Sequence, residues 1–406
     1  MKKTLLTICL VWMCFSLSAQ KIIDLSGKWS FSIDRQDNGE KEKWFSHTLN
    51  DFINLPGSMP EKQKGDEVTA KTQWTGSLYD SSYYYNPYME KYRKEGNIKF
   101  PFFLTPDKHY VGAAWYQKEV NIPADWKGER ILLFLERPHI ETTVWVNGQK
   151  TGMQNSLCVP HQYDITHYVR PGKCTITIRV DNRIKEINVG PDSHSITDQT
   201  QGNWNGIVGR ICLQTTPKTY FDDIQIYPEP EQKLARVKVV IKGTGTAKVK
   251  LSAESFNTDK KHIVPAIQQE IKLNKGVTET EMVLPMGNDM LLWDEFHPAL
   301  YKLKAEVTNG KKTEIKEIQF GMRRFEIKGK WFYVNGRKTQ LRGTVENCDF
   351  PLTGYAPMDV ESWERVFRIC RSYGLNHMRF HSFCPPEAAF MAADRVGFYL
   401  QPEGPS

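Results

Sequence analysis

Residues Asn376–Ser406 read NHMRFHSFCPPEAAFMAADRVGFYLQPEGPS, and this stretch decides the fold of the last part of the chain. Together with the residues before it, the stretch predicts five successive elements: a strand at Gln340–Val345, a helix at Asp359–Tyr373, a strand at Leu375–His381, a helix at Pro385–Val396 and a strand at Gly397–Gln401. Strands that alternate with helices across short connections are typical of the opening of a parallel (β/α)8 TIM barrel. A complete barrel needs about 250 residues. We therefore expect residues 320–406 to form the N-terminal part of a barrel, truncated after roughly its opening third.

Length and composition indicate a folded protein of more than one domain. The chain has 406 residues, 40% hydrophobic and 12% aromatic, which is enough for two or three domains with ordinary cores. The formal net charge of +7 is spread along the sequence without a dense run of Lys or Arg. This pattern predicts a mildly basic surface and no nucleic-acid partner.

The N-terminus has the pattern of a secretory signal peptide. Lys2 and Lys3 precede an apolar stretch at Leu5–Leu17, which is followed by the small residues Ser18 and Ala19. We expect residues 1–19 to be removed and the mature protein to be secreted or periplasmic. The alternative is a membrane anchor, but the apolar core is short for a span. No other segment predicts a membrane span after cleavage.

Cysteine spacing argues against a metal ribbon. Cleavage would leave six cysteines, at positions 158, 174, 212, 348, 370 and 384, and none forms a CxxC pair. An oxidising compartment permits disulfides, but the spacing does not fix a pairing. We expect buried thiols.

Residues 20–217 predict an all-β domain of the jelly-roll type. The alternating runs are Trp29–Ile33, Trp115–Val120, Ile131–Leu135, Thr142–Val146 and Thr175–Val180. Between two of these runs, Asn147-Gly148 predicts a tight hairpin, since both residues tolerate positive φ. A tyrosine-rich segment at Glu61–Tyr110 interrupts the pattern. It has two interpretations, a packed surface insertion, which we favour, or an aromatic loop that contacts sugar.

Residues 218–319 predict a second β domain, an immunoglobulin-like sandwich of roughly seven short strands. The clearest runs are Val237–Ile241, Ala247–Ser252, Glu279–Leu284 and Leu303–Val307. The domain lacks a Cys…Trp…Cys pattern, so it is not of the antibody type.

Six motifs occur in order along the chain: Gly112–Val120 (GAAWYQKEV), Val144–Gly148 (VWVNG) with Tyr163–Thr166 (YDIT), Trp204–Leu213 (WNGIVGRICL), Phe332–Gly343 (FYVNGRKTQLRG), Asn376–Arg379 (NHMR) and Asp394–Glu403. This order resembles glycoside hydrolase family 2, which includes β-galactosidases, β-glucuronidases and β-mannosidases. The resemblance implies a jelly roll, an immunoglobulin-like sandwich and a catalytic TIM barrel.

The resemblance also implies hydrolysis of β-glycosides with retention. That chemistry uses two carboxyl groups about 5–5.5 Å apart, one as acid/base and one as nucleophile. In the family the acid/base follows Asn in an Asn-Glu dipeptide, and this dipeptide occurs nowhere in the sequence. We therefore assign no catalytic residue and expect the acid/base and the nucleophile beyond Ser406.

The strand around Arg379 carries candidate substrate-binding residues. His377, Arg379 and His381 alternate, which predicts that they share one face of the strand. Arg379 matches the family's N-x-x-R motif and could hold a carboxylate or a sugar hydroxyl through forked hydrogen bonds. The alternative is a structural ion pair within the barrel. His381 is a weaker candidate, because the family's usual histidine corresponds to Ser382.

Two further substrate-binding candidates lie on loops. Glu403 matches an acidic active-site position of the family, with a capping or surface carboxylate as the alternative. Asn347 stands where many relatives carry histidine, a departure that could signal a different sugar. Glu346 and Asp349 follow the first strand on the side where barrel chemistry occurs. Glu387 lies in a helix and is expected to be exposed.

The sequence predicts no cofactor and no metal site. We do not expect a metal site from His377, His381 and Cys384, because residues four apart on a strand lie roughly 13 Å apart, too far to share one ion. The family has relatives with a sodium or magnesium site, but no ligand pattern here matches one.

Three functions remain open at this point. The first is a secreted retaining β-glycosidase, most like a β-galactosidase, with β-glucuronide or β-mannoside as alternative substrates. Its partner would be an oligosaccharide or glycoside. The second is a carbohydrate-binding module without catalysis. The third is an inactive truncation, because three parallel strands leave open edges and uncovered helix faces.

Overall fold

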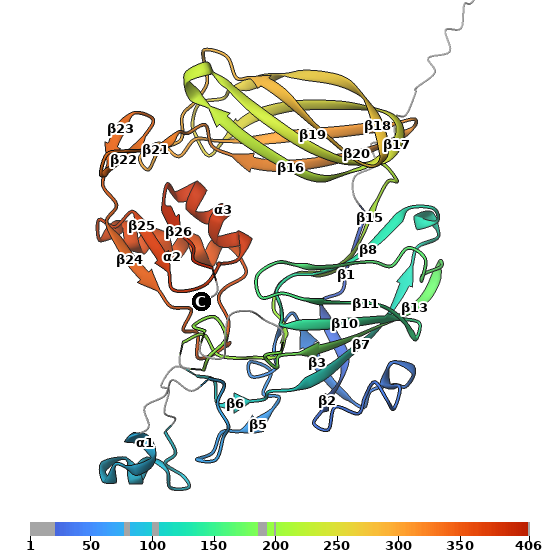
Figure 1. The fold of residues 1–406 in the computed structure, drawn as a ribbon, viewed down its shortest axis with the longest axis vertical. Coiled ribbons are helices and arrows are strands. Elements are labelled where there is room, and N and C mark those ends of the chain that lie inside the picture. Colours follow the sequence, from blue (N-terminus) through green and yellow to red (C-terminus); the bar gives the residue numbers. More distant parts are fainter. Residues whose placement is uncertain (1–20, 77–81, 100–104, 186–192, 199, 405–406) are drawn as a thin grey trace, which may run out of the picture.

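The structure, a computed structural model, describes residues 21–76, 82–99, 105–185, 193–198 and 200–404. The predicted signal peptide lies outside the described residues. Figure 1 shows three regions: a first β region (blue to green), a second β region (yellow) and a parallel α/β unit (orange to red) beside the other two. Among the described residues, no helix is long and apolar enough to cross a bilayer.

The first β region contains two facing sheets with one core between them. The four-stranded sheet has the order β1 (Ile22–Asp24), β15 (Ile211–Thr216), β8 (Arg130–Leu135) and β12 (His161–Asp164). The six-stranded sheet has the order β11 (Gln149–Asn155), β10 (Glu141–Val146), β13 (Gly172–Asp181), β7 (Ala113–Ile122), β2 (Gly27–Asp34) and β3 (Asp51–Leu55). Smaller pairings join β4 (Gly57–Ser58), β14 (Gly206–Ile207) and β9 (Pro138–His139), and β5 (Asp66–Glu67) with β6 (Lys108–His109).

Period-two burial explains how the sequence builds this sandwich. In β8, Ile131, Leu133 and Leu135 are at most 4% exposed and point into the core. Residues at the intervening positions therefore point to the other face of the sheet. The predicted hairpin at Asn147-Gly148 is confirmed, with φ of 50° and 79° between β10 and β11.

The tyrosine-rich segment contains secondary structure of its own. Its described part holds the β5–β6 pair, the short helix α1 (Ser82–Tyr85) and the 3-10 helix η2 (Pro87–Tyr92). Three other 3-10 turns of the chain are η1 (Trp44–Ser46), η3 (Ala124–Trp126) and η4 (Pro230–Gln232). Figure 1 shows α1 projecting away from the two β regions. Tyr83 is buried, whereas Tyr85 and Tyr88 are exposed.

The second β region is built from long strands, which corrects the expectation of about seven short ones. Its strands are β16 (Tyr220–Glu229), β17 (Leu234–Phe256), β18 (Ile263–Pro285), β19 (Leu300–Asn309) and β20 (Lys312–Phe320). The runs at Val237–Ile241 and Ala247–Ser252 belong to the single strand β17. Gly243 and Gly245 between them are not a chain reversal but a register shift against β18, where β17 continues through a bulge.

The parallel unit follows a small sheet of β21 (Phe325–Lys328), β22 (Trp331–Val334) and β23 (Arg337–Thr339). It consists of β24 (Gly343–Glu346), α2 (Val360–Ser372), β25 (His377–Phe380), α3 (Glu387–Val396) and β26 (Tyr399–Gln401). Its three strands pair in parallel. All five predicted elements are present. The first strand lies a few residues later than predicted, and the other elements are two or three residues shorter. Asp359 is the N-cap of α2 rather than its first residue, and Gly397, in the left-handed conformation, caps α3 instead of beginning β26. The TIM barrel itself stays a prediction.

Both helices pack on one face of the parallel sheet. Met378 and Phe380 of β25 join the core formed with Phe367 of α2 and Ala389 of α3. Arg379, between the two core residues, therefore points to the opposite face. One contact joins the unit to the second β region: Arg371 Nη1 donates a hydrogen bond to the carbonyl oxygen of Glu295. The same nitrogen donates to the carbonyl oxygens of Val396 and Gly397 within the unit.

Candidate functional site

The carboxyl ends of the three parallel strands gather the candidate residues at one edge of the sheet. β24 ends at Glu346 and is followed by Asn347, while β25 ends just before His381. Glu403 follows β26 by two residues. His381 lies beyond the end of β25, which corrects the prediction that it belongs to the strand, although its N–H still donates to the carbonyl of Glu346 at 2.9 Å.

An ion pair occupies the centre of this edge. Arg379 Nε donates a hydrogen bond to Glu403 Oε1, and Ser382 Oγ donates to Glu403 Oε2 at 2.8 Å. The guanidinium of Arg379 and then the hydroxyl of Ser382 lower the pKa of Glu403. Glu403 is therefore an ionised acceptor at neutral pH. The sequence left open whether Arg379 would bind substrate or form a structural ion pair, and its Nε is engaged in the ion pair.

His381 contacts two groups from different parts of the chain. Its Nδ1 lies 3.2 Å from Asn347 Oδ1. Its ring meets the ring of His194 edge to face, with centroids 4.4 Å apart. A cis peptide bond joins His381 to Ser382. The four predicted site residues thus form two contacting pairs at one edge of the sheet, Arg379 with Glu403 and His381 with Asn347.

Two more carboxyl groups lie at the end of β24, which is Glu346, and on the loop after it, at Asp349. Burial raises the pKa of Glu346, whose Oε1 accepts a hydrogen bond from the Cys348 N–H at 2.8 Å. Burial, and secondarily the negative charge of Glu346, raises the pKa of Asp349 to about 6. Asp349 therefore changes protonation near neutral pH.

Loops of the first β region reach the same edge, and sequence reasoning missed them. Ser195 Oγ donates to the carbonyl of Ser382 at 2.5 Å, and Arg137 Nη2 donates to the carbonyl of Cys384 at 2.6 Å. These contacts join residues 187 and 247 positions apart. Local periodicity carries no signal for such long-range pairs.

No group of three or more His, Cys, Asp or Glu residues in the described part of the chain has the geometry to hold a metal ion. The six described cysteines are all free thiols. Glu387 is exposed, as predicted, and its carboxylate lies 3.3 Å from Arg210.

Two family descriptions match the two β regions of the chain. The family description "Glycosyl hydrolases family 2, sugar binding domain" matches residues 22–217, and "Glycosyl hydrolases family 2" matches residues 219–323. The chain belongs to glycoside hydrolase family 2. The resemblance seen in the sequence motifs is confirmed.

Curated relatives of this family 2 chain include glucuronidases and galactosidases. Human "Beta-glucuronidase" is 24% identical over 94% of the chain, and "Beta-galactosidase" from Thermoanaerobacter pseudethanolicus is 24% identical over 76%. The chain spans 57% of the length of the human protein and 42% of the length of the bacterial one.

Solved structures show the same fold. A β-glucuronidase from Ruminococcus gnavus in complex with D-glucuronic acid superposes with a TM-score of 0.70 at 19% identity, over 95% of this chain and 60% of that one. A family 2 member from Bacteroides cellulosilyticus gives a TM-score of 0.68 at 20% identity, over 94% and 47%.

Proposed function

We propose that this chain forms part of a retaining β-glycosidase and that the carboxyl ends of β24, β25 and β26 bind the sugar. The observation that carries the proposal is the pairing of Arg379 with Glu403, next to the pairing of His381 with Asn347. Charged and amide groups fixed by one another present donors and acceptors at set positions. Such pre-organisation is what binding of a polyhydroxylated ring requires.

The residues of this edge are suited to positioning the sugar. Glu403 is held ionised by Arg379, so it accepts hydrogen bonds and is a poor proton donor. Retention needs a separate acid/base and nucleophile about 5–5.5 Å apart. Because no Asn-Glu dipeptide occurs among the 406 residues, we assign Arg379 and Glu403 to sugar binding and neither to proton transfer.

The ion pair at the edge favours a neutral sugar, so we propose a β-galactoside as substrate. Glu403 neutralises Arg379, so this pair offers no free positive charge to a uronate carboxylate. A β-glucuronide is the second candidate, because relatives bear the name β-glucuronidase.

Kinetics of the protein encoded by the complete reading frame test the proposal. We expect faster turnover of nitrophenyl β-galactoside than of the corresponding β-glucuronide. Arg379→Ala and Glu403→Gln should each lower kcat/KM about 100-fold, the size of effect seen when one preorganised hydrogen-bonding group of an active site is removed. Arg368→Ala is the matched control, because Arg368 is exposed on α2 and pairs only with Glu364.

Two outcomes contradict parts of the proposal. A tenfold or greater preference for the β-glucuronide would show that the substrate is a glucuronide, while the assignment of the site would stand. Unchanged kcat/KM in both Arg379→Ala and Glu403→Gln would remove the site assignment altogether.

A further inference from the structure

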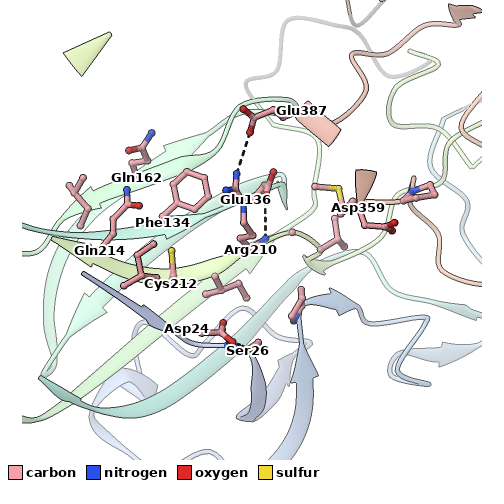
Figure 2. A pocket seen from close by; sticks show the side chains of 18 of the residues that line it. Asp24, Ser26, Phe134, Glu136, Gln162, Arg210, Cys212, Gln214, Asp359 and Glu387 are labelled. Atoms are coloured by element: carbon pink, nitrogen blue, oxygen red, sulfur yellow. Dashed lines mark hydrogen bonds and ion pairs between the residues drawn. The ribbon is translucent and has the colours of Figure 1, made fainter. Parts of the chain in front are cut away.

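A large groove lies away from Arg379 and Glu403, where the three regions meet. It has a volume of about 1510 Å³. Its floor is the outer face of the sheet β1-β15-β8-β12, and its walls include Tyr220 and residues 314–318 of the second β region. Residues 349–359, from the loop after β24, close another side. Figure 2 shows the floor residues with Arg210 and Glu387 at one end.

The floor side chains stand in rows that cross the sheet. Asp24 pairs with Cys212, Cys212 with Phe134 and Phe134 with Gln162, so one residue from each of the four strands lies in a line. Neighbouring strands are about 4.8 Å apart, which makes the row roughly 14 Å long.

A second row runs parallel to the first. It contains Ile22, Gln214, Leu132 and Asp164, one from each strand. The two rows together place amide, carboxylate and apolar side chains in alternation on one surface. A sugar chain presents apolar ring faces and hydroxyl edges in similar alternation, and such sites combine apolar contact with a few placed polar groups.

Polar groups on this surface have unused hydrogen-bonding capacity. Among the described residues, the side-chain amides of Gln162 and Gln214 make no hydrogen bond, although Figure 2 shows both on the floor. Thr216 also lines the groove, is 6% exposed, and its Oγ1 has no partner. A buried hydroxyl without a partner costs free energy that a ligand or bound water can restore.

The charge of the groove selects among ligands. Eight acidic and three basic residues line it. Of the three cations, Arg210 is held by Glu136 and Glu387, and Arg130 by Asp164. An anionic polymer would therefore be repelled, whereas a neutral ligand meets no net charge cost.

We propose that this groove is a second carbohydrate-binding site, which holds a short neutral glycan. Gln162 and Gln214 bond its hydroxyl groups, and Phe134 contacts a ring face. Arg210 precedes β15 and flanks the middle of the first row, with its guanidinium 5.3 Å from the Phe134 ring centroid. This site does not depend on the proposed hydrolysis, because none of its floor residues belongs to the edge that carries Arg379.

Calorimetric titration of the full chain tests the site. We expect saturable binding of a neutral tetrasaccharide, such as β-1,4-linked galactose, mannose or glucose, and much weaker binding of the monosaccharide. The double variant Gln162→Ala/Gln214→Ala and the single variant Phe134→Ala should each weaken binding at least tenfold. The matched control Gln268→Ala/Gln269→Ala, which changes two exposed glutamines of β18, should leave it unchanged.

The outcomes separate this site from the proposed active site. Arg379→Ala should leave tetrasaccharide binding intact, and the glutamine double variant should leave hydrolysis of nitrophenyl glycosides intact. The proposal is overturned if no neutral tetrasaccharide binds, if binding survives the groove variants, or if only a cationic chitosan oligosaccharide binds.

Discussion

The first β region and the parallel unit bury their cores in different ways. In the first region two sheets enclose a core between them, so each sheet covers the other. In the parallel unit two helices cover one face of a three-stranded sheet, and the opposite face carries Arg379. Arg371 ties this unit to the second β region through the carbonyl of Glu295. The candidate sugar site therefore lies on the face of the three-stranded sheet that the two helices do not cover.

The largest expected effect on this comparison comes from removing a buried aromatic ring in the parallel unit. Phe367 is fully buried and stacks on Phe398 with ring centroids 4.8 Å apart. Phe367→Ala should cost about 3–5 kcal/mol of local unfolding free energy. Limited proteolysis should then cut first between residues 325 and 404 and leave both β regions intact.

The same helix supplies the control. Ile369→Ala changes a side chain that is 47% exposed and should alter protection by less than about 0.5 kcal/mol. If Phe367→Ala unfolds all three regions together, the parallel unit is not the separately ordered part of the fold.

A smaller effect is expected in the pH dependence of stability. Asp349 has a pKa raised to about 6 by burial, above its unfolded value of about 3.9. Between those values the folded state holds a proton that the unfolded chain has lost, so stability falls as pH rises through this window. Asp349→Asn should stabilise the unit at pH 7.5 by about 1 kcal/mol, after allowance for solvent screening, and should have no effect below pH 4.

Hydrogen exchange of α2 and α3 amides at the two pH values measures the effect. Asp259→Asn, at an exposed position of the second β region, is the control and should show no pH-dependent difference. If Asp349→Asn stabilised the unit as much at pH 4 as at pH 7.5, Asp349 would not be protonated in the folded unit.

The smallest effect is expected at the bridge between the two compared regions. Arg210 pairs with Glu136 of the first region and, at 3.3 Å, with Glu387 of the parallel unit, and the Arg210 side chain is 65% exposed. Glu387→Gln should weaken protection of α3 by about 0.5 kcal/mol or less at low salt. The effect should vanish near 1 M salt, where the Debye length is about 3 Å. Persistence at high salt would point to a packing role.

Sequence reasoning recovered what is local. The succession β24-α2-β25-α3-β26 follows from periodicity, and the differences are confined to the ends of the elements. The continuity of β17 was missed, because two alternating runs read as separate strands although a bulge at Gly243 and Gly245 joins them in one strand.

In the candidate site, too, the positions of the residues follow from local sequence, whereas their contacts do not. The carboxyl-end positions of Asn347, His381 and Glu403 follow from strand order, since parallel strands end at one edge. The pairing of Glu403 with Arg379, and the approach of His194 to His381, depend on tertiary distances. No spacing rule in a single sequence encodes those distances.

The groove has one further consequence, for how the protein could diversify. Its floor belongs to one region and its walls to two others, so its width depends on how three bodies are inclined to each other. A change in the loop at 349–359 could admit a bulkier chain while every floor residue stays the same. Ligand preference could then differ between related proteins whose contacting residues are identical. A comparison of those residues alone would not show the difference.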